Sequence, residues 1–342
     1  MKKIIFYNFI IFIIFLVLSE LMFGYWFDDD NFGIHMRKHR NRNDLVKTRI
    51  NNVDYKYYYK RNFYGFRGKE INKLQDVNYV FLGGSTGNEK FLPENLTIVG
   101  LLNKFFSYKN KSVNIINASV DGKTSRGHIN DLQIWFPKLK KFNPDFFIIY
   151  VGINDTVLNQ DEKYDLTYDD NVFKNLRDII TNNSIIVELS KKIKWKYFEI
   201  IKFEYDVNQH KNLYNNFLYV DYNSAKKIHD LKKLKIKHKN IYERYKLRLN
   251  SLYKEIKKRN SKIIFITQVK FNGLKDEKLF LLNETLKKFS HENKINILKL
   301  DEIFVGSQDD FYDEMHTTPQ GSEKIAKIMF EYLFTILKKI NF

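Results

Sequence analysis

Cysteine is absent from this chain of 342 residues. Nucleophilic thiols, zinc–thiolate sites and disulfide bonds are therefore excluded. No internal repeat is visible, and with 44% hydrophobic and 16% aromatic residues the composition argues against the disordered, collagenous and disulfide-rich classes. The sequence instead indicates a globular protein with a substantial core, long enough for one large domain or two small ones.

The first part of the chain lacks polar residues almost entirely. An apolar run from Ile4 to Leu18 follows Lys2 and Lys3, and an aromatic cluster at 25–27 closes it. With its flanks the run approaches the ~20 residues that span a bilayer as a helix. The residues that follow the run, Ser19 to Phe23, fit the A-x-A-like site of a signal peptidase poorly. We therefore expect residues 1–27 to form an uncleaved, single-pass signal anchor.

The orientation of this anchor follows from the charges beside it. Lys2 and Lys3 favour a cytoplasmic N-terminus, and acidic residues at 28–30 follow the exit. On the far side of the run, four basic residues also lie close enough to count in the positive-inside rule: Arg37, Lys38, Arg40 and Arg42. We expect the rest of the chain to lie on the extracytoplasmic side.

Positive charge is unevenly spread, with a formal net charge of +18 for the whole chain. Residues 191–260 hold 20 Lys or Arg against 7 Asp or Glu. Such a block is able to bind nucleic acid or anionic lipid, or it is simply a solvated helical face. Because the lysine excess runs through the whole chain, we interpret it as background composition and do not expect a nucleic-acid partner.

Beyond residues 28–75, a polar and aromatic juxtamembrane extension, short apolar runs alternate with helical patterns. The predicted strands are Val77–Leu82, Val113–Ile116, Phe146–Val151, Ile263–Thr267 and Ile295–Leu300. The predicted helices lie near 95–107, 127–142, 240–259, 279–293 and 322–340. This alternation predicts an α/β domain over residues 76–342 with a mainly parallel sheet, whose ligands bind at the carboxyl ends of the strands.

One segment, residues 160–240, does not fit the alternation. It is long, basic and rich in tyrosine, with irregular helical patterning. We interpret it as an insertion that forms a helical cap over one edge of the sheet.

The stretch NYVFLGGSTGNEK, Asn78 to Lys90, stops an apolar run at two glycines and then presents Ser85. Glycines tolerate the unusual backbone angles of a sharp strand-to-helix turn, and the N–H groups of the helix start suit a developing negative charge. A plain turn or a phosphate cradle has a similar composition, but the stretch lacks the P-loop lysine and the G-x-G-x-x-G spacing. The α/β-hydrolase elbow also matches, although that fold places its nucleophile after several strands and here only one precedes Ser85.

Two later loops offer hydrogen-bond donors. NASVDGKTS, residues 117–125, follows the second strand and contains Gly122, and IIYVGIND follows the third strand and contains Asn154. The N–H groups of Ser85 and Gly122 and the amide of Asn154 would together form an oxyanion hole. Taken singly, a turn glycine and a helix-capping asparagine are the simpler interpretations.

The stretch FYDEMHTTPQG places Asp313 and His316 three residues apart, ahead of the last helix. A serine hydroxyl needs a base to take its proton, and the base needs a carboxylate to orient it. This spacing supplies both from one loop. The alternative is a surface histidine with a capping aspartate.

The four motifs, in this order, resemble the four blocks of the SGNH hydrolases, also called the GDSL lipase/esterase family. The resemblance covers residues ~76–342 with the insertion unmatched, and the segment YGFRG at 64–68 looks like the lead-in of membrane-anchored bacterial members. It implies a flavodoxin-like three-layer α/β/α fold without metal or cofactor. Gly84 stands where the family name has aspartate, and Ser119 stands where many members have glycine.

The resemblance implies a role for each motif residue. Ser85 would be the nucleophile, His316 the base and Asp313 its orienting acid, with Gly122 and Asn154 as oxyanion donors beside Ser85. We therefore expect a membrane-anchored serine esterase that removes acyl groups from an envelope carbohydrate or lipid. An O-acyltransferase with the same triad and a non-catalytic module that binds glycan or a partner protein remain as alternatives.

Overall fold

The computed structural model describes seven segments of the chain, and the residues between them are not considered further. These segments are 2–27, 40–74, 77–109, 113–157, 172–198, 200–206 and 217–340.

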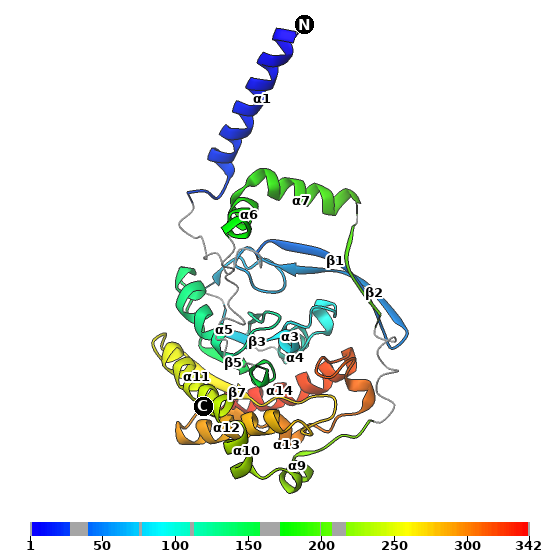
Figure 1. Ribbon diagram of the computed structural model, residues 1–342, viewed down its shortest axis with the longest axis vertical. Helices are drawn as coiled ribbons and strands as arrows, with labels where there is room; N and C mark the ends of the chain where they lie inside the picture. The colour runs from blue at the N-terminus through cyan, green and yellow to red at the C-terminus, as the bar shows by residue number, and fades with distance from the viewer. Residues whose placement is uncertain are drawn as a thin grey trace.

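A five-stranded sheet lies at the centre of the molecule (Figure 1). Its strands are β3 (Tyr79–Gly83), β4 (Ile115–Asn117), β5 (Phe146–Tyr150), β7 (Lys262–Ile266) and β8 (Asn296–Leu298). They are ordered β4-β3-β5-β7-β8, and every neighbouring pair is parallel. Each overlaps its predicted range, and this order is that of the flavodoxin-like fold. The fold class expected from the sequence is confirmed.

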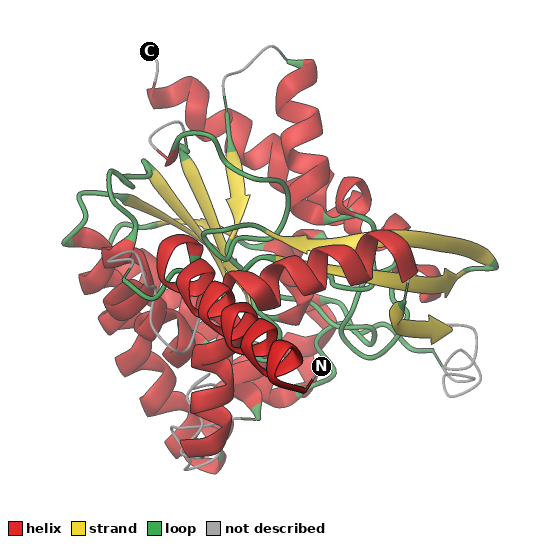
Figure 2. Cartoon of the chain, turned by 90° about the horizontal axis from the view of Figure 1, so that it is seen from above, coloured by secondary structure: helices red, strands yellow, loops and turns green. Residues whose placement is uncertain are grey.

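Helices cover both faces of the sheet (Figure 2). One face packs against α5 (Ser125–Asn130), α11 (Lys239–Lys257) and α12 (Glu277–Glu292), and the other against α4 (Ile98–Tyr108) and α14 (Pro319–Ile340). Side chains alternate between the two cores, since Val80 and Leu82 belong to the first and Phe81 to the second. Because both faces are buried, the strands are mostly apolar, and their polar residues stand at strand ends: Asn117, Lys262 and Asn296.

The helix predicted at 127–142 is broken in the structure. After α5 the chain forms a π-helical turn, η3 (Asp131–Trp135), and a 3-10 turn, η4 (Phe136–Lys138). Pro137 has no N–H to continue the α-helical hydrogen-bond ladder. Other short turns are η2 (Glu94–Leu96), η5 (Asn154–Thr156), α13 (Leu300–Ile303) and η6 (Gln308–Asp310).

A β-hairpin precedes the sheet, in the segment that the sequence interpretation treated as an extension with weak periodicity. Strands β1 (Arg42–Ile50) and β2 (Val53–Arg61) pair antiparallel across a two-residue turn. Asn51 and Asn52 both have a positive φ, 50° and 64°. Two positive φ angles are the requirement of a type I′ hairpin turn, and asparagine tolerates them better than most residues.

The predicted insertion at 160–240 divides into two parts, although 158–171, 199 and 207–216 lie outside the described residues. Its first part forms α6 (Val172–Asn183), α7 (Ile185–Phe198) and β6 (Ile201–Asp206), and β6 pairs parallel with β1. The strand was not expected from the irregular helical pattern. The second part forms α9 (Tyr222–Ile228) and α10 (Leu231–Lys237), which share a small core with α12.

Helix α1 (Lys2–Phe23) projects from the body beyond α6 and α7 (Figure 1). Its stretch Lys3–Phe23 is long and apolar enough to cross a membrane, and none of it is buried. A signal sequence would have the same length and composition, so the helix alone does not separate the two.

Arg61 connects the hairpin to the sheet. Its guanidinium is buried and donates from Nε and Nη2 to the carbonyl oxygen of Gly65, at 2.9 and 2.6 Å. Its Nη1 donates to the carbonyl oxygen of Ser119 at 2.8 Å and to Asn88 Oδ1 at 3.2 Å. One side chain therefore ties β2 to loops that follow β3 and β4.

We expect Arg61→Met to lower the free energy of unfolding by roughly 3 kcal/mol, because it leaves several buried acceptors without a donor. Lys60→Met, at the exposed neighbouring position, is the matched control and should change it by no more than about 0.5 kcal/mol. Equilibrium unfolding in urea measures both. Equal effects of the two substitutions would show that the buried network does not stabilise the fold.

Candidate active site

Ser85 occupies the first position of α3 (Ser85–Asn88), a single helical turn directly after β3. It is partly exposed, while every other residue from Phe81 to Glu89 is buried. The chain thus presents one hydroxyl at the carboxyl edge of the sheet.

The glycines around Ser85 serve close packing, a role that the sequence interpretation did not include. Gly83, Gly84 and Gly87 all have negative φ. A Cβ on Gly87 would lie 2.7 Å from Ser119 Oγ, and a Cβ on Gly84 would lie 2.2 Å from Asn154 Nδ2. Glycine is therefore required because the neighbouring loops approach the backbone closely.

The three residues predicted as a triad form one hydrogen-bonded chain. His316 Nε2 lies 2.7 Å from Ser85 Oγ, and His316 Nδ1 lies 2.6 Å from Asp313 Oδ2. Both distances suit a nucleophile and base oriented by an acid. The ring of Tyr312 stacks on that of His316, with centroids 5.6 Å apart and planes 14° apart. The D-x-x-H loop therefore supplies both partners to a serine that is 231 residues from the histidine.

Asp313 is held by its own turn. Its Oδ1 accepts hydrogen bonds from the N–H groups of Met315 at 2.9 Å and His316 at 2.7 Å. Burial raises the pKa of Asp313, but these bonds and the bond to the His316 ring outweigh it and lower the pKa below its ordinary value. The carboxylate is therefore ionised at neutral pH and able to stabilise a charged imidazole.

Two of the predicted oxyanion donors, Gly122 and Asn154, lie in loops that hydrogen-bond to each other. Asn154 Nδ2 donates to the carbonyl oxygen of Lys123 at 2.8 Å, next to Gly122. Gly122 has a φ of 77°, and no atom lies within 4 Å of the position of a Cβ there. Among the described residues no protein acceptor takes the N–H of Ser85 or of Gly122. These groups are available to a substrate oxygen.

A buried ionic cluster, missed from sequence, supports the Gly122 loop. Lys123 pairs with Asp131 of η3, and the other carboxylate oxygen of Asp131 lies 3.2 Å from His128 Nδ1. Burial raises the pKa of Asp131, but Lys123 and His128 lower it to about 2. The cluster anchors Lys123, whose carbonyl holds Asn154.

Asp155, next to Asn154, reaches across to the start of α5. Its carboxylate accepts from the N–H of Ser125 at 3.1 Å and from Ser125 Oγ at 2.5 Å, at the start of α5. Arg248 of α11 lies 3.5 Å from the same group. Asp155 therefore holds its loop to α5 and α11, while the neighbouring Asn154 stays partly exposed.

Gln268, two residues after the end of β7, joins the first and third loops. Its Oε1 accepts from the N–H of Ile153 at 2.6 Å, and its Nε2 donates to Thr86 Oγ1 at 3.1 Å. Asn283 of α12 holds its backbone on both sides. The only sequence signal was a polar residue at the carboxyl end of a buried strand.

Glu89 is a second residue that sequence reasoning missed. It ends α3 with a positive φ of 45°, and its carboxyl is buried. Oε2 accepts from the N–H of Ile98 at 2.6 Å, while Oε1 accepts from Thr317 Oγ1 at 3.1 Å and Ser322 Oγ at 2.5 Å. It therefore links the Ser85 helix to the His316 loop. Burial raises the pKa of Glu89 to about 7, although these hydrogen bonds and Arg67 act to lower it.

Within the described ranges, no group of three or more His, Asp or Glu side chains is placed to hold a metal ion.

Comparison with known proteins finds a family and several distant structures. The family model described as GDSL-like Lipase/Acylhydrolase matches residues 79–329. No curated protein matches the chain. Among solved structures, the esterase EstA from Pseudoalteromonas sp. is 15% identical, with 76% of this chain and 98% of that chain covered and a TM-score of 0.40. An Axe2 mutant, an acetyl-xylooligosaccharide esterase from Geobacillus stearothermophilus, is 14% identical, with 75% and 93% covered and a TM-score of 0.43. At these TM-scores the likenesses decide nothing about substrate.

Glu89 should make stability depend on pH. Its folded pKa of about 7 exceeds the ordinary value of 4.5, so the folded chain holds a proton that the unfolded chain releases. The free energy of unfolding should therefore fall by about 3 kcal/mol on account of Glu89 as the pH rises from about 4.5 to about 7. Glu89→Gln keeps the hydrogen bonds without the charge and should remove that loss.

Urea unfolding at pH 5 and pH 8 measures the effect, with Glu323→Gln on the exposed face of α14 as the control. The difference in the free energy of unfolding between the two pH values should be smaller for Glu89→Gln than for the wild type, and unchanged for the control. The same pH difference in all three proteins would contradict a buried carboxyl that titrates near neutrality.

Proposed function

The chain belongs to the family of GDSL-like lipases and acylhydrolases and is an ester hydrolase of the SGNH type, and from this premise we propose that it works through an acyl-enzyme on Ser85. The observation that carries the proposal is the hydrogen-bonded chain from Ser85 through His316 to Asp313, with its distances of 2.7 and 2.6 Å.

In the first half of the reaction, Ser85 Oγ attacks the ester carbonyl carbon. His316 Nε2 takes the hydroxyl proton as the new bond forms and then gives it to the departing alcohol. Asp313 accepts a hydrogen bond from Nδ1–H of the ring, which fixes the tautomer that leaves Nε2 free as the base. Its lowered pKa keeps it negative beside the imidazolium.

The negative charge on the carbonyl oxygen needs donors that are already in place. The N–H groups of Ser85 and Gly122 and the second amide hydrogen of Asn154 supply them in this proposal, since the first amide hydrogen is bound to the Lys123 carbonyl. Water activated by His316 then attacks the acyl-enzyme and releases the acid. No step calls for a metal or an organic cofactor.

An anchor at residues 1–27 would hold the enzyme beside a membrane and restrict it to esters found there. We therefore propose an acylated carbohydrate or lipid of the envelope as the substrate, with acetyl as the first acyl group to test. Lys2 and Lys3, in the first turn of α1, favour a cytoplasmic N-terminus, and on this ground we propose that the catalytic domain lies on the extracytoplasmic side.

Ser85→Ala should lower the turnover of p-nitrophenyl acetate by ~10⁴-fold or more, because the acyl-enzyme cannot form. A fluorophosphonate probe should label the wild type at Ser85 alone, as located by peptide mapping. Ser251→Ala, on the exposed side of α11, is the control and should keep both activity and labelling. Labelling of another serine, or activity retained in Ser85→Ala, would refute the proposed nucleophile.

Gly84 should matter through Asn154. A Cβ at position 84 would meet the Asn154 amide at 2.2 Å, so Gly84→Ala should displace that donor. Asn154→Ala should cost ~10²–10³-fold in turnover, and Gly84→Ala a comparable amount. The double variant should be no slower than Asn154→Ala, because the displaced group is already absent. Losses that multiply in the double variant would mean that Gly84 acts independently of this amide.

A further inference from the structure

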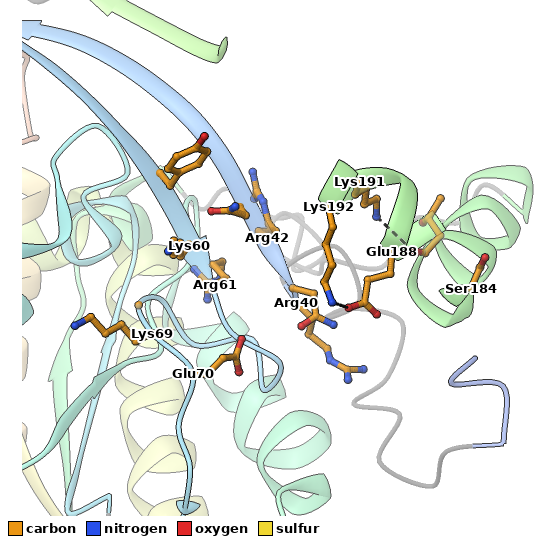
Figure 3. A pocket seen from close by; sticks show the side chains of 15 residues that line it. Arg40, Arg42, Lys60, Arg61, Lys69, Glu70, Ser184, Glu188, Lys191 and Lys192 are labelled. Atoms are coloured by element: carbon orange, nitrogen blue, oxygen red, sulfur yellow. Dashed lines mark hydrogen bonds and ion pairs between the residues drawn. The ribbon is translucent and has the colours of Figure 1, made fainter. Parts of the chain in front are cut away.

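A basic cavity of about 650 Å³ lies between the β1–β2 hairpin and helices α6 and α7 (Figure 3). None of Ser85, Asp313 and His316 lines it. Ester hydrolysis at Ser85 therefore does not account for the cavity.

The charges of the cavity are strongly one-sided. Of its fifteen lining residues, seven are basic and two are acidic: Arg40, Arg42, Lys60, Arg61, Lys69, Lys191 and Lys192 against Glu70 and Glu188. Lys192 pairs with Glu188. Within the part of the chain that the structure describes, the ammonium groups of Lys60 and Lys69 have no hydrogen-bond or ion-pair partner. The excess of positive charge favours an anion with several oxygens, such as a phosphate.

The cavity begins where the apolar helix α1 ends. Glu20, in the last turn of α1, accepts hydrogen bonds from Ser184 Oγ at 2.5 Å and from the N–H of Ile186 at 3.1 Å. The N–H of Tyr25 donates to the Asn183 carbonyl at 2.8 Å. Ser184 is also a lining residue of the cavity. These bonds fix the cavity beside the end of α1, so it lies at the membrane surface if α1 is the anchor.

Helix α7 presents opposite faces to the cavity and to solvent. Ser184, Glu188 and Lys191 line the cavity at intervals of four and three residues. Leu189 and Ile193, four residues apart on the other side, are 49% and 54% exposed. On α6, Leu176 and Ile180 are 52% and 44% exposed. A helix with a basic side and an exposed apolar side suits the boundary between lipid headgroups and acyl chains.

We propose that this cavity binds the phosphate groups of anionic lipids at the surface of the membrane that holds α1, with the exposed apolar sides of α6 and α7 resting in the same interface. The inference rests on the proposed anchor and goes beyond the proposed reaction. It gives the first part of the insertion a function, which is to hold the domain against the membrane by charge and apolar contact.

The test uses the full chain reconstituted in nanodiscs of phosphatidylcholine, with and without phosphatidylglycerol. Phosphatidylglycerol should raise the unfolding temperature by about 2–4 °C, because it binds the folded chain only. The Lys60→Gln/Lys69→Gln pair should abolish this rise, and Lys232→Gln/Lys233→Gln on exposed α10 should retain it. All variants should hydrolyse p-nitrophenyl acetate at the wild-type rate, which reports correct folding.

The possible outcomes separate the sources of phosphate and the two proposals. An equal rise from inorganic phosphate added to phosphatidylcholine discs would make the cavity a free-anion site and overturn the lipid assignment. If the chain stays in the discs but phosphatidylglycerol does not raise its unfolding temperature, the inference alone is overturned. A chain that does not remain with the discs overturns the anchor and the inference together.

The apolar side of α7 has its own readout, made simple by the absence of cysteine. Ile193→Cys carrying an environment-sensitive fluorophore should shift to shorter wavelength in discs relative to detergent-free buffer without lipid. Leu247→Cys, 66% exposed on α11, is the matched control and should not shift. If the emission of the fluorophore at position 193, like that of the control, does not shift in discs, α7 lies outside the interface.

Discussion

Much of the active-site architecture depends on holding α3, a helix of only four residues that has no stability of its own. Hydrogen bonds to other parts of the chain hold the residues that follow Ser85. Arg61 binds Asn88, Gln268 binds Thr86, and Glu89 binds the loop that carries His316. Because these polar groups are buried, each needs its partner, and losing one costs more than the bond itself. The position of one hydroxyl is thus fixed by residues from several parts of the chain.

Segments that carry none of the four motifs contribute directly to this arrangement. The hairpin supplies Arg61, and the lead-in supplies Arg67, whose Nε binds Glu94 at 2.7 Å ahead of α4. The insertion supplies Tyr205 of β6, whose ring lies 5.7 Å from that of Tyr312, which in turn stacks on His316. The hairpin, the lead-in and the insertion therefore do not merely connect α1 to the rest of the chain. Strands β1, β2 and β6 form a second, smaller sheet that contacts the His316 loop through Tyr205.

Tertiary structure also separates charges that the sequence places together. The lysines of residues 191–260 begin on α7, near the end of α1, and continue through α9 and α10 at the opposite end of the molecule (Figure 1). Basic residues from before the sheet, including Lys60 and Lys69, instead join those of α7 around one cavity. A charge count along the chain does not identify such a surface, because the residues that form it are more than a hundred positions apart.

The α/β alternation, the five strands and the order of the four motifs could be predicted from the sequence, because apolar runs and turn glycines are local signals. It also brought forward Ser85, Asp313 and His316 as candidates. The folded chain was needed to show that the glycines around Ser85 make room for Asn154 and Ser119, and that Glu89 and Gln268 bridge the loops. The same holds for β6, whose partner β1 lies about 155 residues away in the chain. Burial and long-range pairing create these roles, and neither leaves a periodic pattern in the sequence.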